Sequence, residues 1–387
     1  MSVSLGLPQV RSAGPAPSGA PAEAGLVDRH GRRATDMRLS VIDKCNLRCT
    51  YCMPADGLPW LPAAQLMSAD EIVRLVGVGV ARLGIAELRL TGGEPLVRRD
   101  LEEIVAGVRT AHPSLPVSLT TNGIGLAGRA RGLAEAGLTR VNISLDSLSA
   151  ATFRALARRD RLADVLAGAE AAAAAGLSPV KINAVLMRGV NDHEAADLLA
   201  WALERGFALR FIEQMPLDAD HGWTRADMVT AAEIRDRLGE RFRLSPHPGR
   251  RDGAPAELWE VRPAAPAQGP AAGPAAGPGA GDPGGGGPGA GDEPLGTVGV
   301  IASVTEPFCA DCKRTRITAE GKVRSCLFSH EEVDLLPLLR AGASDVELAE
   351  RWRAAMWAKP AAHGMDHVGL DSADYVQPER SMSAIGG

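Results

Sequence analysis

The chain has 387 residues, of which 42 are Lys or Arg and 47 are Asp or Glu, so its formal net charge at pH 7 is −5. This mild acidity argues against a nucleic-acid-binding protein, which normally has a clear excess of basic residues. A bound polyanion would have to meet a local cluster of Lys and Arg. No run of about 18 uninterrupted apolar residues is present, so the sequence predicts no membrane span.

Residues 1–28 are rich in Ala, Gly, Pro and Ser and lack the basic and apolar regions of a secretory signal. We expect a disordered tail over 1–28 and a cytoplasmic protein. The six cysteines form two close triplets that lie far apart in the chain. Three disulfides are formally open, but two triplets in a long chain without a secretion signal favour two sets of ligands.

Strands and helices alternate after this tail. Apolar patterns predict strands over 37–43, 87–91, 117–121, 140–146, 180–186 and 209–215. Between them, patterns of helical period predict helices over 70–83, 101–110, 126–136, 162–175 and 193–205. Strand–helix units in series imply a parallel sheet, and six units are too few for a closed eight-stranded barrel. The sequence therefore predicts an α/β fold with a partial (βα)6 TIM-type barrel over 29–245.

Polar motifs follow the first four predicted strands. The first cysteine triplet follows strand one, and TGGEP (91–95), TTNG (120–123) and SLDS (144–147) follow the next three. Functional residues of such barrels gather at the carboxyl ends of the strands, so we expect these motifs to meet.

The remaining chain is predicted to form a second region. Residues 246–262 begin it, and residues 263–294 consist of Pro, Ala and Gly with four exceptions, a composition that cannot bury a core. We expect this segment to be a linker or a surface insertion. Residues 295–387 are predicted to form an α+β extension, with strands in 297–304 and on both sides of a turn at 319–321. The chain ends in Gly386–Gly387.

Cys45, Cys49 and Cys52 have the spacing C-x3-C-x2-C. Three thiolates on one loop can bind three corners of an iron–sulfur cube and leave the fourth iron open. A structural zinc needs four protein ligands, and His30 is the only additional candidate close in sequence. The spacing, with aromatic Tyr51 before the third cysteine, favours the cluster over zinc or unrelated thiols.

The stretch CNLRCTYCMP (45–54) resembles the signature of radical S-adenosylmethionine (SAM) enzymes, and LTGGEPL (90–96) resembles their glycine-rich SAM-binding element. The resemblance implies the partial barrel and a 4Fe–4S cluster whose open iron chelates SAM. It also implies cleavage of SAM to methionine and a 5′-deoxyadenosyl radical. Gly92 and Gly93 would let the backbone approach the SAM amino group closely.

The second triplet is Cys309, Cys312 and Cys326. On spacing alone a zinc site completed by His330 and an iron–sulfur cluster both stay open. Arg314 and Arg316 lie between the ligands, two residues apart on a predicted strand, and therefore face the same side. A purely structural zinc site has no need of them, so they favour a binding site.

Residues 37–261 and 297–387 resemble the family of GTP 3′,8-cyclases, also called molybdenum cofactor biosynthesis protein A. The resemblance implies a second 4Fe–4S cluster, with one iron free to bind the guanine of GTP. Carried over by position, the GTP contacts fall on Arg38, Arg89, Thr120, Lys181, Arg210, Arg314 and Arg316. The SAM contacts fall on Tyr51, Gly93, Ser144 and Met215. Each cation alone is more often a surface ion-pair partner, but cations on several strands could converge on a triphosphate.

The family's reaction would convert GTP to (8S)-3′,8-cyclo-7,8-dihydroguanosine 5′-triphosphate, the first step of molybdenum cofactor biosynthesis. The radical would abstract H3′ of the ribose, and the resulting carbon radical would attack C8 of guanine. Arg314, Arg316 and the terminal Gly386 and Gly387 are the expected catalytic positions, with the glycines reaching where side chains would not fit. The implied partners are GTP, an electron donor such as flavodoxin or ferredoxin, and cyclic pyranopterin monophosphate synthase, while a homodimer stays open.

Three features depart from the family pattern: Glu87 replaces a basic residue, Lys313 replaces Asn or Asp, and residues 263–294 are inserted. One alternative is another two-cluster radical SAM enzyme, such as a peptide maturase. The other is a non-catalytic zinc or cluster protein. Peptide maturases usually carry more C-terminal cysteines than the three found here. This small number, together with the Arg-x-Arg element and the Gly–Gly end, favours the cyclase.

Overall fold

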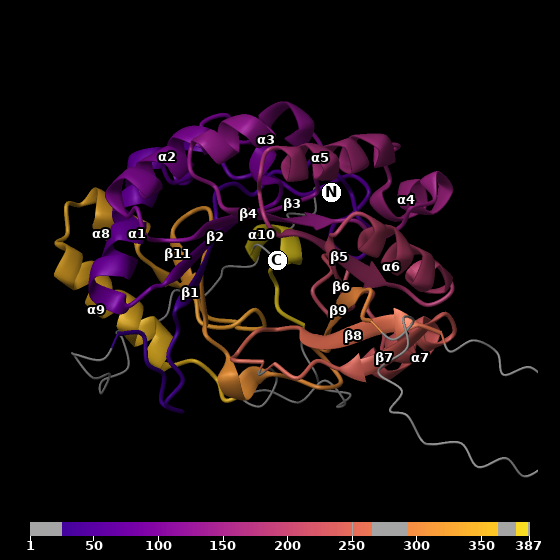
Figure 1. Ribbon diagram of the computed structural model, residues 1–387. Coiled ribbons are helices and arrows are strands. Elements are labelled where there is room, and N and C mark those ends of the chain that lie inside the picture. The colour runs from indigo at the N-terminus through magenta and orange to yellow at the C-terminus, as the bar shows by residue number, and fades with distance from the viewer. Residues whose placement is uncertain (1–24, 250, 265–292, 363–376, 386–387) are drawn as a thin grey trace, which may run out of the picture.

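The structure, a computed structural model, describes residues 25–249, 251–264, 293–362 and 377–385. Its centre is a curved sheet of parallel strands with helices on the outer face (Figure 1). The parallel strands of the predicted barrel are β1 (Asp36–Ser40), β2 (Glu87–Thr91), β3 (Val117–Thr121), β4 (Arg140–Ser144), β5 (Val180–Leu186) and β6 (Ala208–Glu213). The helices that follow them are α1 (Ala69–Leu83), α2 (Leu101–Ala111), α3 (Leu126–Glu135), α4 (Ala150–Ala157), α5 (Leu162–Ala174), α6 (Ala195–Glu204) and α7 (Ala231–Gly239).

The predicted alternation of strands and helices is confirmed. β2, β3 and β5 have the predicted bounds, whereas β1, β4 and β6 end two or three residues earlier because the chain turns there into the site loops. α4 and α7 were not predicted from the sequence pattern. Local signals set the ends of α1: Ser68 and Glu71 form a capping box at its start, and Gly84 ends it in a left-handed conformation.

The C-terminal region extends the same sheet at both edges. In the described part of the chain, twelve strands follow the order β12-β11-β10-β1-β2-β3-β4-β5-β6-β9-β8-β7. Its strands are β7 (Phe242–Pro246), β8 (Glu257–Pro263), β9 (Gly296–Ile301), β10 (Arg314–Ile317), β11 (Lys322–Arg324) and β12 (Val333–Asp334). β10 pairs in parallel with β1, and β9 pairs in parallel with β6. The second cysteine triplet is therefore brought beside the first strand of the barrel.

The N-terminal segment and the Pro/Ala/Gly segment can be compared with the domain boundaries predicted from the sequence. Leu26 is fully buried and Val27 pairs with Arg33, so the ordered fold includes residues that the expected tail of 1–28 contained. The Pro/Ala/Gly segment connects β8 to β9, neighbouring strands in which Val261 pairs with Gly296, and its residues 265–292 lie outside the described residues.

Helices α8 (Leu336–Arg340), α9 (Asp345–Trp357) and α10 (Met382–Ile385) complete the described chain. α9 packs against α1, and its fully buried Trp352 donates a hydrogen bond from Nε1 to Thr315 Oγ1 at 2.9 Å. α10 lies in the centre of the curved sheet (Figure 1). Among the described residues, no helix is long and apolar enough to cross a membrane.

Candidate active site

The first cysteine triplet and the glycine-rich loop line one cavity at the carboxyl ends of the strands. Cys45, Cys49 and Cys52 lie in the loop after β1, and the four positions expected to bind SAM line the same cavity: Tyr51, Gly93, Ser144 and Met215. His30, the additional candidate for a zinc site here, instead lines a surface cavity beside residues 310–313. The structure thus brings together the predicted cysteines and the predicted SAM positions.

The glycines of TGGEP are required by the backbone packed behind them. A Cβ atom on Gly93 would lie 2.3 Å from the carbonyl oxygen of Asp43, and one on Gly92 would lie 2.2 Å from that of Ile42. Gly92 also has a positive φ of 146°. Hydrogen bonds from Gly93 N to Ile42 O (2.8 Å) and from Glu94 N to Lys44 O (2.7 Å) hold this loop against the cysteine loop. The physical reason for the glycines therefore includes the fit of two loops as well as approach to a ligand.

Glu94 and Asp146 are buried carboxylates in this cavity, and neither was predicted from the sequence as a site residue. Glu94 accepts hydrogen bonds from Thr121 Oγ1 and Asn122 N, both at 2.6 Å, and so ties the end of β2 to the end of β3. Asp146 accepts a hydrogen bond from Tyr51 OH at 2.6 Å. Burial raises the pKa of Glu94 to about 7 and that of Asp146 to about 6.

The thiols of this end are poorly suited to ionise in the absence of positive charge. Burial raises the pKa of Cys52 to about 12, and the charge of Cys45 adds to this effect. Burial, with the charge of Asp146, also raises the pKa of Cys49 well above its ordinary value. A bound cation is needed to hold these sulfurs as thiolates.

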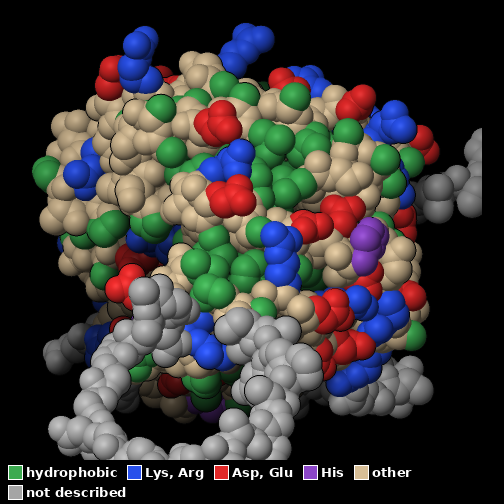
Figure 2. Space-filling model, turned by 45° about the vertical axis from the view of Figure 1, so that its right-hand side comes forward, with side chains coloured by type: hydrophobic (Ala, Val, Ile, Leu, Met, Phe, Trp, Pro, Cys, Tyr) green, Lys and Arg blue, Asp and Glu red, His purple; other side chains and the backbone are tan. Residues whose placement is uncertain are grey.

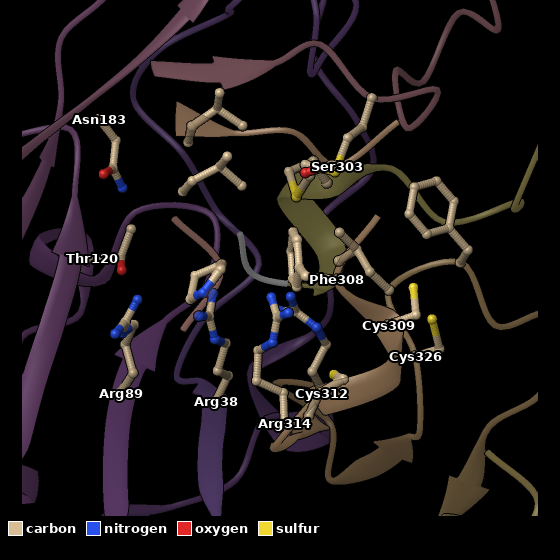
Figure 3. Close-up of a pocket in the computed structure, with 18 of the residues that line it drawn as sticks. Arg38, Arg89, Thr120, Asn183, Ser303, Phe308, Cys309, Cys312, Arg314 and Cys326 are labelled. Carbon is tan, nitrogen blue, oxygen red and sulfur yellow. The ribbon is translucent and has the colours of Figure 1, made fainter. Parts of the chain in front are cut away.

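The second triplet lines an adjoining cavity together with most of the predicted GTP contacts (Figure 3). Cys309, Cys312 and Cys326 share it with Arg38, Arg89, Thr120, Arg210, Arg314 and Arg316. The strand register explains this convergence, because Arg316 of β10 is paired with Arg38 of β1, which is paired with Arg89 of β2. In Figure 3 the guanidinium groups of Arg38, Arg89 and Arg314 point into the same space.

Three of the predicted positions are not among the residues that line this cavity. Lys181 does not line this cavity. Burial lowers its pKa, and the charges of Arg210, Arg140 and Arg89 lower it further. It therefore belongs to the same basic cluster, at the beginning of the strands. Gly386 and Gly387 lie outside the described residues, although Met382 of α10 lines both cavities. His330, which could have completed a zinc site, is not among the lining residues.

The cations of the second cavity are only partly balanced by an anion, Asp36, whose Oδ2 lies 3.7 Å from Nη2 of Arg38. Burial and the charge of neighbouring Arg89 lower the pKa of Arg38 to about 9, and burial also lowers that of Arg89 to about 10. The buried Nε atoms of Arg38 and Arg89 have no hydrogen-bond partner within the described residues. Buried polar atoms normally have partners, so this arrangement fits a polyanionic ligand that supplies acceptors. On the face shown in Figure 2, acidic and basic side chains are interspersed.

Cys312 differs from the thiols of the first triplet. Although burial opposes ionisation, the charges of Arg314 and Lys359 lower the pKa of Cys312 to about 6. Phe308, before Cys309, packs under Arg314, whose Cζ lies 4.7 Å from the ring centroid. The cation and the cysteine loop are thus fixed together.

The two cavities form one continuous site because they share Thr120, Asn183, Ile212, Met215 and Met382. Asn183 could have been predicted, since it lies two residues after Lys181 on the same face of β5. Met382 could not, because no local pattern indicates that the C-terminal helix enters the barrel.

Each cavity offers three thiols, and these match three corners of a 4Fe–4S cube. None of the six cysteines forms a disulfide in the described chain. Within the described residues, no three His, Cys, Asp or Glu side chains converge as ligands of one metal ion. A cube binds its thiolates through separate irons, so such thiolates lie farther apart than the ligands of a single ion.

Two family models and several named relatives match this chain. Residues 39–202 match the model of the Radical SAM superfamily, and residues 290–365 match that of Molybdenum Cofactor Synthesis C. The GTP 3′,8-cyclase of Paenarthrobacter nicotinovorans is 65% identical over 96% of this chain and 100% of its own length. That of Mycolicibacterium smegmatis is 53% identical over 99% of both chains. The crystal structure of Streptococcus suis SuiB bound to precursor peptide SuiA is similar over 55% of this chain and 46% of that chain, with 16% identity and a TM-score of 0.45.

The parallel barrel, the C-x3-C-x2-C loop and the glycine-rich loop beside it define a radical SAM protein. The match to relatives over nearly the whole chain then gives the particular family. This chain belongs to the family of GTP 3′,8-cyclases.

Proposed function

We propose that this chain cyclises GTP to (8S)-3′,8-cyclo-7,8-dihydroguanosine 5′-triphosphate, the first step of molybdenum cofactor biosynthesis. The observation that carries this proposal is the placement of the two cysteine triplets in two adjoining cavities that share lining residues, with a converging set of arginines at the second triplet. A site with thiols at both ends and cations at one of them suits a reaction between a cofactor and a polyanionic substrate.

Cys45, Cys49 and Cys52 would hold one 4Fe–4S cluster, and Tyr51, Gly93, Ser144 and Met215 would surround SAM. When bound, cluster and SAM supply the one-electron reductive cleavage that makes a 5′-deoxyadenosyl radical. The chain's own part is to position the reactants and to exclude water. Glu94 helps to position the reactants by fixing the ends of β2 and β3 relative to each other, and Asp146 helps by holding Tyr51 through a hydrogen bond.

Cys309, Cys312 and Cys326 would hold the second cluster, and Arg38, Arg89, Lys181, Arg210, Arg314 and Arg316 would hold GTP. Several arginines on different strands can hold a triphosphate in one orientation, because each guanidinium forms directional paired hydrogen bonds. Thr120 and Met215 border both cavities, so the ribose would lie beside them, within reach of the SAM end. Holding C3′ and C8 of GTP in contact supplies much of the rate for the ring closure.

We further propose a cytoplasmic enzyme, because cluster ligands must stay as thiols, and a flavodoxin- or ferredoxin-type electron donor. The product would pass to a cyclic pyranopterin monophosphate synthase.

The decisive experiment measures anaerobic release of 5′-deoxyadenosine from SAM by reconstituted protein with a reductant, without substrate and with GTP, ATP or a peptide pool. We expect strong stimulation by GTP alone, and a cyclised triphosphate with the same mass as GTP, because the hydrogen atom lost to deoxyadenosine is replaced by an electron from the reductant and a proton from water. Stimulation by peptides would favour a maturase instead. No release from protein with intact clusters would favour a non-catalytic binding protein.

A further inference from the structure

Lys359 is a buried cation to which the proposed reaction gives no role. It follows α9 closely, and only 3% of its surface is exposed. Its Nζ donates hydrogen bonds to Cys312 Sγ at 3.2 Å and to the carbonyl oxygen of Arg314 at 2.8 Å. It also lies 3.4 Å from the carbonyl oxygen of Cys312. Its partners thus belong to the three-residue stretch that joins the second triplet to the Arg-x-Arg element.

The segment that carries Lys359 is fixed from a second side by Arg32. Nη1 of Arg32 donates hydrogen bonds to the carbonyl oxygens of Cys309 and Ala361, both at 2.7 Å, and Nη2 donates to that of Pro360. Nε of Arg32 pairs with the buried carboxylate of Asp28 at 2.6 Å. The cysteine loop is therefore clamped to residues 359–361 by two cations from opposite ends of the chain.

Burying a lysine side chain costs conformational entropy and desolvation, and a buried ammonium must be hydrogen-bonded. Lys359 meets this requirement with a sulfur and a carbonyl oxygen rather than with a carboxylate. A carboxylate would neutralise the lysine inside the protein. The sulfur can do so only as a thiolate, which is the state in which it binds iron.

We propose that Lys359 is a positioning residue for the second iron–sulfur cluster, and that its ammonium group donates a charge-assisted hydrogen bond to the Cys312 sulfur that ligates iron. This inference rests on the proposed function in one respect, that Cys312 is a cluster ligand. Hydrogen bonds to cysteine sulfur stabilise the extra electron of the reduced cluster and so raise its reduction potential. Through the Arg314 carbonyl, the same lysine fixes the residue that would contact the nucleotide.

Lys313 offers a matched control on the same loop. It follows Cys312 directly in the sequence, but its Nζ pairs with Asp252 at 2.7 Å, so this lysine is bonded elsewhere. Lys359→Met and Lys313→Met each remove one lysine charge from the surroundings of the second triplet. Only the first removes the hydrogen bond to sulfur.

The test uses the full chain, reconstituted anaerobically, with Cys45, Cys49 and Cys52 replaced by alanine so that the second cluster alone gives an electron paramagnetic resonance signal. The midpoint potential of that signal is measured by redox titration in the parent, Lys359→Met, Lys359→Arg and Lys313→Met. We expect a more negative potential for Lys359→Met, partial recovery for Lys359→Arg, and little change for Lys313→Met. Equal shifts for the two methionine variants would show a general charge effect and overturn the proposal.

A second measurement does not depend on replacing Lys359. Protein made with isotope-labelled lysine in the Lys313→Met background should show coupling between the reduced second cluster and a lysine nitrogen in pulsed electron paramagnetic resonance. No such coupling would overturn the inference even where Lys359→Met fails to fold. A parent that binds no iron at the second triplet would instead overturn the cluster assignment in the proposed function.

Discussion

The two ends of the site cavity have opposite electrostatic character. Around the first triplet, the described lining residues include Glu94, Asp146 and Glu213 and no Lys or Arg. Around the second triplet, they include five arginines and no Asp or Glu. A single barrel thus presents an acidic end and a basic end a short distance apart.

The pKa values of the thiols also differ between the two ends of the site. Burial raises the pKa of Cys45, Cys49 and Cys52, whereas Arg314 and Lys359 lower that of Cys312. SAM carries a sulfonium cation and GTP carries a polyanionic triphosphate. The acidic end therefore suits the first ligand and the basic end suits the second, so that charge alone favours one arrangement of the two in the cavity.

The largest effects should come from removing one ligand at each end. We expect Cys49→Ala to abolish SAM cleavage, because the first cluster loses one of its three thiolates. Cys312→Ala should leave the first cluster intact and retain slow SAM cleavage that no longer responds to GTP. Iron content should fall by about half in each variant, since each triplet serves one of two similar clusters. Equal loss of GTP-independent cleavage in both variants would contradict the separation of the two ends.

The next effect concerns the arginines of the basic end. Arg316 is buried, and burial together with the charge of Arg38 lowers its pKa. Arg316→Ala should weaken GTP binding by about 30-fold or more, since truncating a buried charge partner costs about 2–5 kcal/mol. SAM binding should be unchanged. Equilibrium binding of both ligands tests this, with the exposed Arg131→Ala as the control, and similar losses for GTP and SAM would indicate misfolding.

The sequence predicted the acidic end better than the basic end. The cysteine loop follows β1, Gly93 follows β2 and Ser144 ends β4, and the carboxyl ends of neighbouring parallel strands meet at one edge of a sheet. Local patterns were therefore enough to bring them together. Glu94 was missed because its partners, Thr121 and Asn122, become neighbours only when β2 and β3 align.

The basic end depends on contacts between distant segments. Residues 295–387 were predicted as a separate extension, but β9 and β10 flank the barrel on opposite edges of one sheet. No local pattern specifies these pairings. Lys359 was missed for the same reason, since its partner Cys312 lies 47 positions earlier in the chain. The positions carried over from the family were needed to place the arginines with the second triplet.

A smaller effect should depend on pH. Burial, together with the charges of Arg210, Arg140 and Arg89, lowers the pKa of Lys181 to about 7. Lys181 is protonated below this value and attracts a triphosphate, and it loses its charge as the pH rises through it. GTP affinity should therefore be full below pH 7 and fall by up to about tenfold per pH unit above it.

Equilibrium binding of GTP between pH 6 and pH 9 would measure this decline, with these two limits chosen to bracket the pKa of about 7. Lys181→Arg should flatten the profile, because an arginine keeps its charge at higher pH. Lys181→Met should bind weakly at every pH. An equally steep profile in the methionine variant would assign the titration to another group.

The smallest effect should come from Glu87, the acidic residue at the edge of the basic cluster. Its carboxylate pairs with Arg140 at 2.8 Å and is partly exposed. Glu87→Lys should release Arg140 and add a cation, raising GTP affinity by about two- to fivefold at low salt, as expected for exposed charges worth up to about 1 kcal/mol. Without nucleotide, repulsion between Lys and Arg140 should lower the melting temperature slightly. Because such charges are screened by salt, the gain should vanish at high ionic strength. A gain that persists there would mean a direct contact with the triphosphate, and a loss of affinity would mean that Glu87 orients Arg140 toward the nucleotide.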